Sequence, residues 1–145
     1  MGKLLVLALF SALGLSAQTA QTVPMNDLEK DFQESLTGVV LEGQYTHDGS
    51  PGVSADKYTI EKIVKTGEDR WTFFASIEFK GQAMTVPLPL QVKWAGDTPV
   101  ITVTDMAVPG MGTYTARVVV YRGQYAGTWS AGKGGGKLFG RIVKK

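Results

Sequence analysis

The sequence predicts an all-β protein, an eight-stranded antiparallel up-and-down meander closed into a barrel and preceded by a short helix. Apolar and polar residues alternate with period two in eight stretches beyond Gly38, which is typical of strands that bury one face. The connections are too short for crossover helices, so neighbouring strands run antiparallel. Closure into a barrel removes exposed strand edges. A two-sheet sandwich is the alternative, because it produces much the same alternation.

Residues 1–17 have the composition of a cleavable signal peptide. Lys3 gives a positive start, an apolar run follows, and small residues end the segment before Gln18. The apolar run is shorter than the roughly 20 residues of a membrane-spanning helix, and a buried N-terminal helix is the alternative interpretation. We therefore expect a bacterial protein exported to the periplasm or secreted, and not an integral membrane protein.

The composition limits the kinds of site that the chain can build. Its 145 residues are 43% hydrophobic and 19% charged, as in an ordinary globular domain. The absence of cysteine excludes disulfides, thiolate zinc sites and a bacterial lipid anchor. Since there is also only one histidine, we expect no metal and no cofactor. The expected organisation is a signal peptide over 1–17, a lead-in and short helix over 18–36, and a single barrel domain over 37–145.

A short helix is predicted over residues 26–36. Asn26 is a good N-cap, and Glu29 three residues later completes a capping box. Three apolar side chains share one face of this helix: Leu28, Phe32 and Leu36. That face packs against the sheet or, more specifically, plugs one mouth of the barrel. The strands are then predicted over 39–46, 57–65, 70–79, 82–94, 99–106, 113–121, 124–130 and 137–143.

The least ambiguous hairpin turns at Lys80-Gly81, where glycine supplies the positive φ of a two-residue turn. This turn places Trp71 opposite Leu90 on a wholly apolar face. On the second strand, Pro87 and Pro89 lack N–H groups on the side that faces away from the hairpin partner. We therefore predict a gap in the pairing on that far side, with pairing resumed toward the end of the strand.

A second two-residue turn, at Arg122-Gly123, sets the register of the C-terminal strands and places Val118 opposite Gly127. Across the last loop we place Trp129 opposite Leu138, so that Gly127 meets Gly140. The inner face then carries a notch of small side chains between larger ones. Either a ring from across the barrel fills the notch, or it belongs to a ligand cavity. The candidate ligand-binding residues are Trp71, Trp94, Val118, Gly127, Trp129 and Gly140.

The C-terminal segment also resembles known proteins. Gly127-Thr128-Trp129-Ser130, followed by Gly134-Gly135 and by Leu138-Phe139-Gly140-Arg141-Ile142, resembles the C-terminal signature of small exported bacterial proteins with no established function. More remotely, Gly-Thr-Trp on a barrel strand is similar to the calycin group of avidins and lipocalins. In those families the motif lies on the first strand and here on the seventh, so their ligand residues do not transfer. The resemblance covers about residues 121–143 and implies an exported calycin-like barrel.

Two local motifs share residue types with chemical sites but lack the required context. His47, Asp48 and Ser50 are neighbours, but a hydrolytic triad needs a rigid arrangement in space, and we interpret this stretch as a polar turn. The glycine-rich segment 133–137 has phosphate-loop ingredients, but such a loop leads into a helix and here a strand follows. We therefore expect no enzyme.

Basic residues gather on the outward face of the last strands: Arg117, Lys137 and Arg141, with Phe139 among them. This face is either simply solvated or a binding face for an anionic envelope component, a lipid or a polysaccharide. We expect no nucleic-acid partner in an exported protein. The leading hypothesis is a non-enzymatic binding or interaction module of the cell envelope that holds a small apolar or amphipathic ligand inside the barrel, and the anionic surface partner is the alternative.

Overall fold

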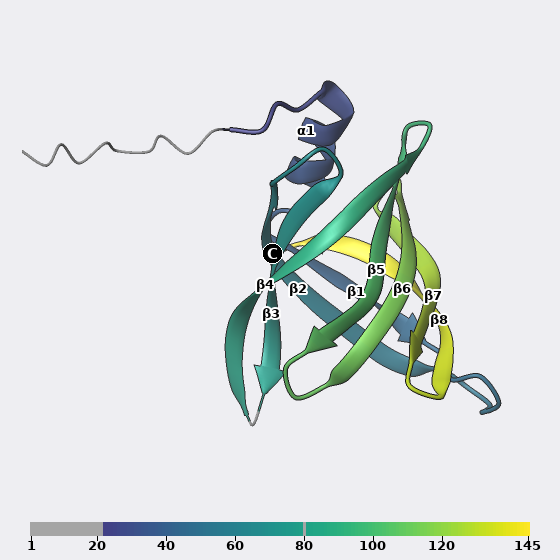
Figure 1. Ribbon diagram of the computed structural model, residues 1–145. Coiled ribbons are helices and arrows are strands. Elements are labelled where there is room, and N and C mark those ends of the chain that lie inside the picture. Colours follow the sequence, from purple (N-terminus) through teal and green to yellow (C-terminus); the bar gives the residue numbers. More distant parts are fainter. Residues whose placement is uncertain (1–21, 80) are drawn as a thin grey trace, which may run out of the picture.

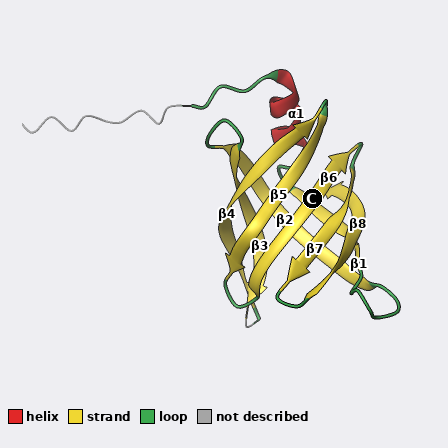
Figure 2. Cartoon of the chain, turned by 45° about the vertical axis from the view of Figure 1, so that its right-hand side comes forward, coloured by secondary structure: helices red, strands yellow, loops and turns green. Residues whose placement is uncertain are grey.

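The computed structural model describes residues 22–79 and 81–145, so the predicted signal peptide lies outside the described residues. The eight strands pair in chain order and close into an antiparallel barrel (Figures 1 and 2), which confirms the predicted fold class over the sandwich. The helix and strands are α1 (Asp27–Ser35), β1 (Val39–Tyr45), β2 (Ser54–Lys65), β3 (Arg70–Phe79), β4 (Gln82–Ala95), β5 (Thr98–Val108), β6 (Gly112–Tyr121), β7 (Gln124–Ala131) and β8 (Gly134–Lys144).

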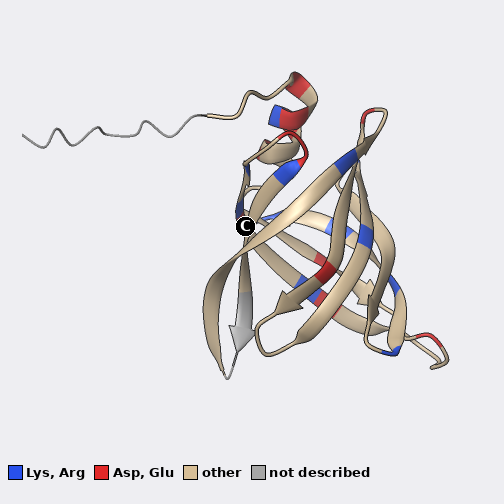
Figure 3. Cartoon of the chain, in the orientation of Figure 1, with Lys and Arg blue, Asp and Glu red and all other residues tan. Residues whose placement is uncertain are grey.

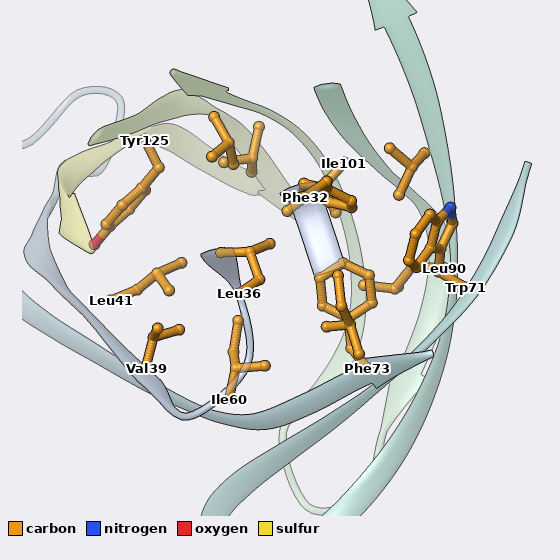
Figure 4. Close-up of a cluster of buried hydrophobic side chains, with 14 of the residues drawn as sticks. Phe32, Leu36, Val39, Leu41, Ile60, Trp71, Phe73, Leu90, Ile101 and Tyr125 are labelled. Carbon is orange, nitrogen blue, oxygen red and sulfur yellow. The ribbon is translucent and has the colours of Figure 1, made fainter. Parts of the chain in front are cut away.

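The helix α1 starts as predicted and covers one mouth of the barrel. The Asn26 side chain accepts from the Glu29 backbone N–H at 2.9 Å, and the Glu29 carboxylate accepts from the Asn26 N–H at 3.0 Å. Phe32 and the C-cap residue Leu36 are buried in the barrel core (Figure 4). The Phe32 ring meets Trp71 edge-on, with 5.3 Å between ring centroids. We call this mouth the helix end, and the opposite mouth the open end.

A buried ion pair fixes the helix to the barrel. The Lys65 ammonium, on the inner face of β2, lies 2.7 Å from the Glu29 carboxylate, and both side chains are buried. Lys65 also donates to the Pro24 carbonyl at 3.1 Å. Burial alone would raise the pKa of Glu29, but the hydrogen bonds from Lys65 and from the Asn26 backbone outweigh it and lower that pKa. The charged carboxylate therefore stabilises the docked helix.

This ion pair predicts a specific acid sensitivity. Because the pKa of Glu29 is lower in the folded chain than its unfolded value of about 4.3, its contribution to stability is complete above that value and is lost as the pH falls through the folded pKa. We expect the melting temperature of the unmodified chain to fall more steeply between pH 6 and pH 3 than that of Glu29→Gln. Glu34→Gln, at an exposed position of the same helix, should keep the steep fall. Parallel curves for the unmodified chain and Glu29→Gln would contradict the assignment.

The β3–β4 hairpin has the predicted register and the predicted gap beside it. Trp71 pairs with Leu90, and Gly81 has a φ of 76°. Pairing between β4 and β5 is confined to residues 91–95 and 98–102, beyond the two prolines. On the other side, pairing between β2 and β3 ends at Thr59 and Ser76. The end of this hairpin therefore projects from the barrel wall at the open end (Figure 1).

The register of the last two strands corrects our prediction. The β6–β7 pairing is as expected, with Val118 opposite Gly127. However, β7 and β8 join through a two-residue turn at 132–133, so that Gly127 faces Leu138 and Gly140 faces Tyr125, while Trp129 faces Gly136. The predicted pairs Trp129–Leu138 and Gly127–Gly140 are wrong by two residues. Because the shift is even, the inward face is unchanged, but each glycine now faces a large side chain and the row of small residues does not exist.

Glycines permit the tight curvature of β1, β7 and β8. A Cβ placed on Gly43, Gly127, Gly136 or Gly140 would overlap a backbone carbonyl oxygen of the neighbouring strand. No side chain can be accommodated there without moving the backbone, so glycine is required by close approach. The Tyr125 hydroxyl occupies space that side chains at Gly43 and Gly140 would fill, and it lies 2.7 Å from a Cβ placed on Gly140.

We expect Gly127→Ala to destabilise the barrel by about 1–3 kcal/mol, the range of overpacked interiors. The added methyl group would collide with the Arg117 carbonyl on β6. Gly134→Ala is the matched control, because its Cβ would make an ordinary contact of 3.6 Å with the Ala131 carbonyl. Denaturant unfolding of both variants checks this prediction, and equal stabilities would show that the strands can separate without cost.

Candidate functional site

The predicted ligand-binding residues do not form one site. Trp71 is buried at the helix end, and Trp94 lies beside it against Phe32, with 5.8 Å between ring centroids. Trp129 lies at the open end, where its indole N–H donates to the Thr46 carbonyl at 3.2 Å. The remaining candidates are inner-face positions of β6, β7 and β8, namely Val118, Gly127 and Gly140.

The inner face remains accessible at the open end. Tyr58 faces inward, because it is opposite the buried Leu41, and yet it is 42% exposed. Met84 shares the inward side of β4 with buried Leu90 and is 45% exposed. The barrel is therefore packed at the helix end and open at the other. Further inward positions of this half are Tyr45, Asp56, Val86, Met106, Tyr114, Ala116 and Trp129.

Three polar side chains meet on this inner face, and we call them the Asp56 site: Asp56, Tyr58 and Tyr125. The Tyr58 hydroxyl donates to the Asp56 carboxylate. Asp56 is the cross-strand partner of Gly43, and the Tyr125 hydroxyl lies directly over Gly43. A directly opposite pair places Cβ positions about 5 Å apart, so the Tyr125 hydroxyl lies next to Asp56 on the inner surface.

The Tyr125 hydroxyl is unusual because it is buried without a partner. Tyr125 is 2% exposed, and its hydroxyl has no hydrogen-bond partner within residues 22–79 and 81–145. The Trp71 indole N–H is also buried without a hydrogen-bond partner among these residues, but it lies in the apolar core at the helix end. In Figure 4, Tyr125 lies on the far side of the core from Trp71. A buried phenol usually finds a partner, so this hydroxyl is an exception to that rule.

Both phenols of the site stay neutral at physiological pH. Burial raises the pKa of Tyr58, and its hydrogen bond to the negatively charged Asp56 raises it further. Burial and the same carboxylate raise the pKa of Tyr125 to about 12. Each hydroxyl can therefore donate one hydrogen bond and accept others.

Aromatic rings form one side of the open end. The His47 ring stacks edge-on against Trp129 at 5.0 Å and against Tyr45 at 5.4 Å between centroids. His47 thus packs on aromatic rings, while Asp48 forms an ion pair with Lys137 at 3.3 Å. This arrangement fits our interpretation of the 47–50 stretch as a polar turn.

A lateral groove of about 470 Å³ opens through the wall between β4 and β5. It lies where the prolines of β4 interrupt the pairing with β5. Its lining combines inward and outward residues of the wall, namely Val86, Pro87, Leu88, Pro89, Thr104, Met106, Ala107 and Pro109. Three residues of this lining also belong to the inner face, namely Val86, Leu88 and Met106. A second cavity, of about 400 Å³, flanks α1 at the helix end, and Trp94 is one of its lining residues.

The basic residues lie outward as predicted, but each already contacts an acceptor. Arg141 forms an ion pair with Glu42 at 3.5 Å, and Lys137 pairs with Asp48. Arg117 donates to the Val103 carbonyl at 2.6 Å. Figure 3 shows lysines and arginines distributed over several strands and not gathered in one patch.

Comparisons with other proteins add no assignment: no family model, curated protein or solved structure matches the chain significantly. Within the described ranges, no group of three or more histidine, cysteine, aspartate or glutamate side chains is placed to hold a metal ion. In the same residues, no helix has both the length and the apolar character needed to cross a membrane.

The sequence analysis identified neither the Asp56 site nor the lateral groove. It placed residues 47–56 in a loop, because this stretch is rich in turn-forming residues. In the structure β2 begins at Ser54, and these residues continue the inward face. The alternation of Ser54, Asp56 and Tyr58 was the available signal.

We expect Tyr125→Phe to leave stability unchanged or to raise it by about 1 kcal/mol, since it removes a buried polar group that lacks a partner. Tyr121→Phe, at an exposed tyrosine of β6, is the control and should have no effect. A loss of more than about 1 kcal/mol in denaturant unfolding would show that the Tyr125 hydroxyl has an intramolecular partner.

Proposed function

We propose that this protein is a non-enzymatic binding module that holds a small apolar or amphipathic ligand in the open end of its barrel. The lateral groove carries this proposal, because inward residues of β4 and β5 take part in its lining. Its volume of about 470 Å³ lies within the range of small-molecule pockets, which is about 300–1,000 Å³. An apolar wall with a few convergent polar groups is also typical of such pockets.

The location of the ligand follows from how the two ends are filled. At the helix end, Phe32 and Leu36 occupy the interior. At the open end, apolar residues such as Leu88 and Met106 remain only partly buried. Burying that apolar surface under a ligand would contribute roughly 25 cal/mol per Å². The open end is therefore the part of the interior that gains most from a guest.

We further infer that the chain is exported and acts in the cell envelope or outside the cell. The signal-like composition of residues 1–17 supports this inference. The closed antiparallel barrel is also consistent with the calycin-like architecture that the C-terminal segment resembles. An anionic partner at the outward basic face has less support, since Arg117, Lys137 and Arg141 already contact acceptors.

Filling the lateral groove should weaken ligand binding. We expect Ala107→Trp to weaken the binding of ten-carbon amphiphiles, measured by calorimetry, by about tenfold, the effect of losing about 1.4 kcal/mol. Ala107 lines the groove, whereas Ala126 is an exposed residue of β7 outside it. Ala126→Trp is therefore the matched control and should bind as the unmodified chain does.

Three probes share one ten-carbon alkyl chain and differ only in the charge of the head group: decylamine, decanol and decanoate. Failure of all three to bind the unmodified protein would overturn the proposed function, and equal losses in both tryptophan variants would overturn the location. Native mass spectrometry of protein purified from its own source gives an independent reading. It reports a retained ligand and shows whether the mature chain begins at Gln18.

A further inference from the structure

Asp56 lies on the inner face at the open end and belongs to none of the ion pairs within residues 22–79 and 81–145. Asp56 faces inward, opposite Gly43. The ion pairs of residues 22–79 and 81–145 involve six other carboxylates, those of Asp27, Glu29, Asp69, Asp48, Glu42 and Glu61. The inward lysine of β2, Lys65, is engaged with Glu29 at the helix end. A half-buried carboxylate on a barrel wall is costly unless it is solvated or paired.

From this arrangement we propose that the Asp56 site binds the cationic head group of an amphiphile, a primary ammonium whose apolar chain lies along the open end. This inference rests on the proposed function and names the chemical class of its ligand. Asp56 supplies the opposite charge, and the Tyr58 and Tyr125 hydroxyls supply further acceptors. Their juxtaposition over Gly43 creates the site.

The number of acceptors matches an ammonium group. A primary ammonium has three N–H donors and no acceptor. The Asp56 carboxylate accepts from Tyr58 and from the Lys57 backbone N–H at 3.0 Å, which leaves lone pairs on both oxygens free to accept more. Tyr58 keeps lone pairs on its donating oxygen, and the buried Tyr125 hydroxyl has none of its bonds used. An ammonium at this point would satisfy all three groups together.

Aromatic faces strengthen the case for a cation. Tyr58, Tyr114 and Tyr125 share the inner face near the carboxylate. Aromatic rings attract cations through their negative faces, and the attraction grows when the site is desolvated. The same surroundings disfavour a carboxylate ligand, because Asp56 would repel it at close range in a weakly screened site.

The apolar part of the ligand has a path along the inner face. Met84 and Val86 lie on the inward side of β4, and Val86 also lines the lateral groove. A chain that starts at the Asp56 site therefore runs over apolar surface toward the gap between β4 and β5. The head group stays inside, and the chain accounts for the apolar lining of the groove.

The test is head-group selectivity, measured by calorimetry with decylamine, decanol and decanoate. We expect the unmodified protein to bind decylamine about tenfold more tightly than decanol, as a charge-assisted hydrogen bond implies, and to bind decanoate most weakly. The formal net charge of +2 would favour decanoate, so a preference for the amine has to come from the local site. Asp56→Asn should abolish the preference, whereas Asp48→Asn, at the same end of the barrel but outside it, should keep it.

Tyr125→Phe provides a second variant that should fold even if Asp56→Asn does not. We expect it to reduce the advantage of decylamine over decanol several-fold, with little change for decanol. Equal affinities of the unmodified protein for all three probes would overturn the head-group inference and leave the proposed function standing. Absence of binding by every probe would overturn the proposed function itself. Retained selectivity in a folded Asp56→Asn variant would place the ammonium elsewhere.

Discussion

Two missing N–H groups determine where the barrel wall is continuous. In β4 the odd-numbered residues direct their backbone groups toward β5, and two of them, Pro87 and Pro89, have no N–H to donate. The pairing with β5 is therefore restricted to the last part of β4, and the end of the β3–β4 hairpin leaves the wall. The lateral groove and the accessible inner face both follow from this local loss of hydrogen bonding.

On the opposite wall, which β1, β7 and β8 form, the strands approach one another closely instead of separating. In β1, β7 and β8, glycines allow backbones to approach so closely that any Cβ would collide with a carbonyl. The Tyr125 hydroxyl then occupies the space over Gly43 and Gly140. This position brings it beside Asp56. The wall formed by β1, β7 and β8 is thus tightly packed, whereas the wall between β4 and β5 has a gap. The Asp56 site lies on the tightly packed wall, at the open end of the barrel.

The sequence predicted the fold and two registers because turn chemistry and burial agreed there. At 80–81 and 122–123 a glycine with positive φ and an apolar face each require the same alignment. At 131–136 several glycines can take the turn positions, so turn chemistry does not select one alignment. We chose a longer loop, whereas the chain makes the shorter turn at Gly132. The notch was a consequence of that choice.

The Asp56 site was harder to predict for a physical reason, which a comparison of Asp56 with the buried carboxylate of Glu29 explains. Glu29 is buried at the helix end, and Asp56 faces inward at the open end. Glu29 is buried and has Lys65 at 2.7 Å, so the cost of its burial is offset within the chain. Asp56 keeps contact with solvent and has a phenol as its side-chain partner. An inward polar residue interrupts the alternation of apolar and polar residues by which core strands are recognised. Such interruptions are expected at functional sites, where binding and not stability determines the residue type. The unpaired carboxylate at the open end is best understood as one whose counter-charge comes from outside the chain.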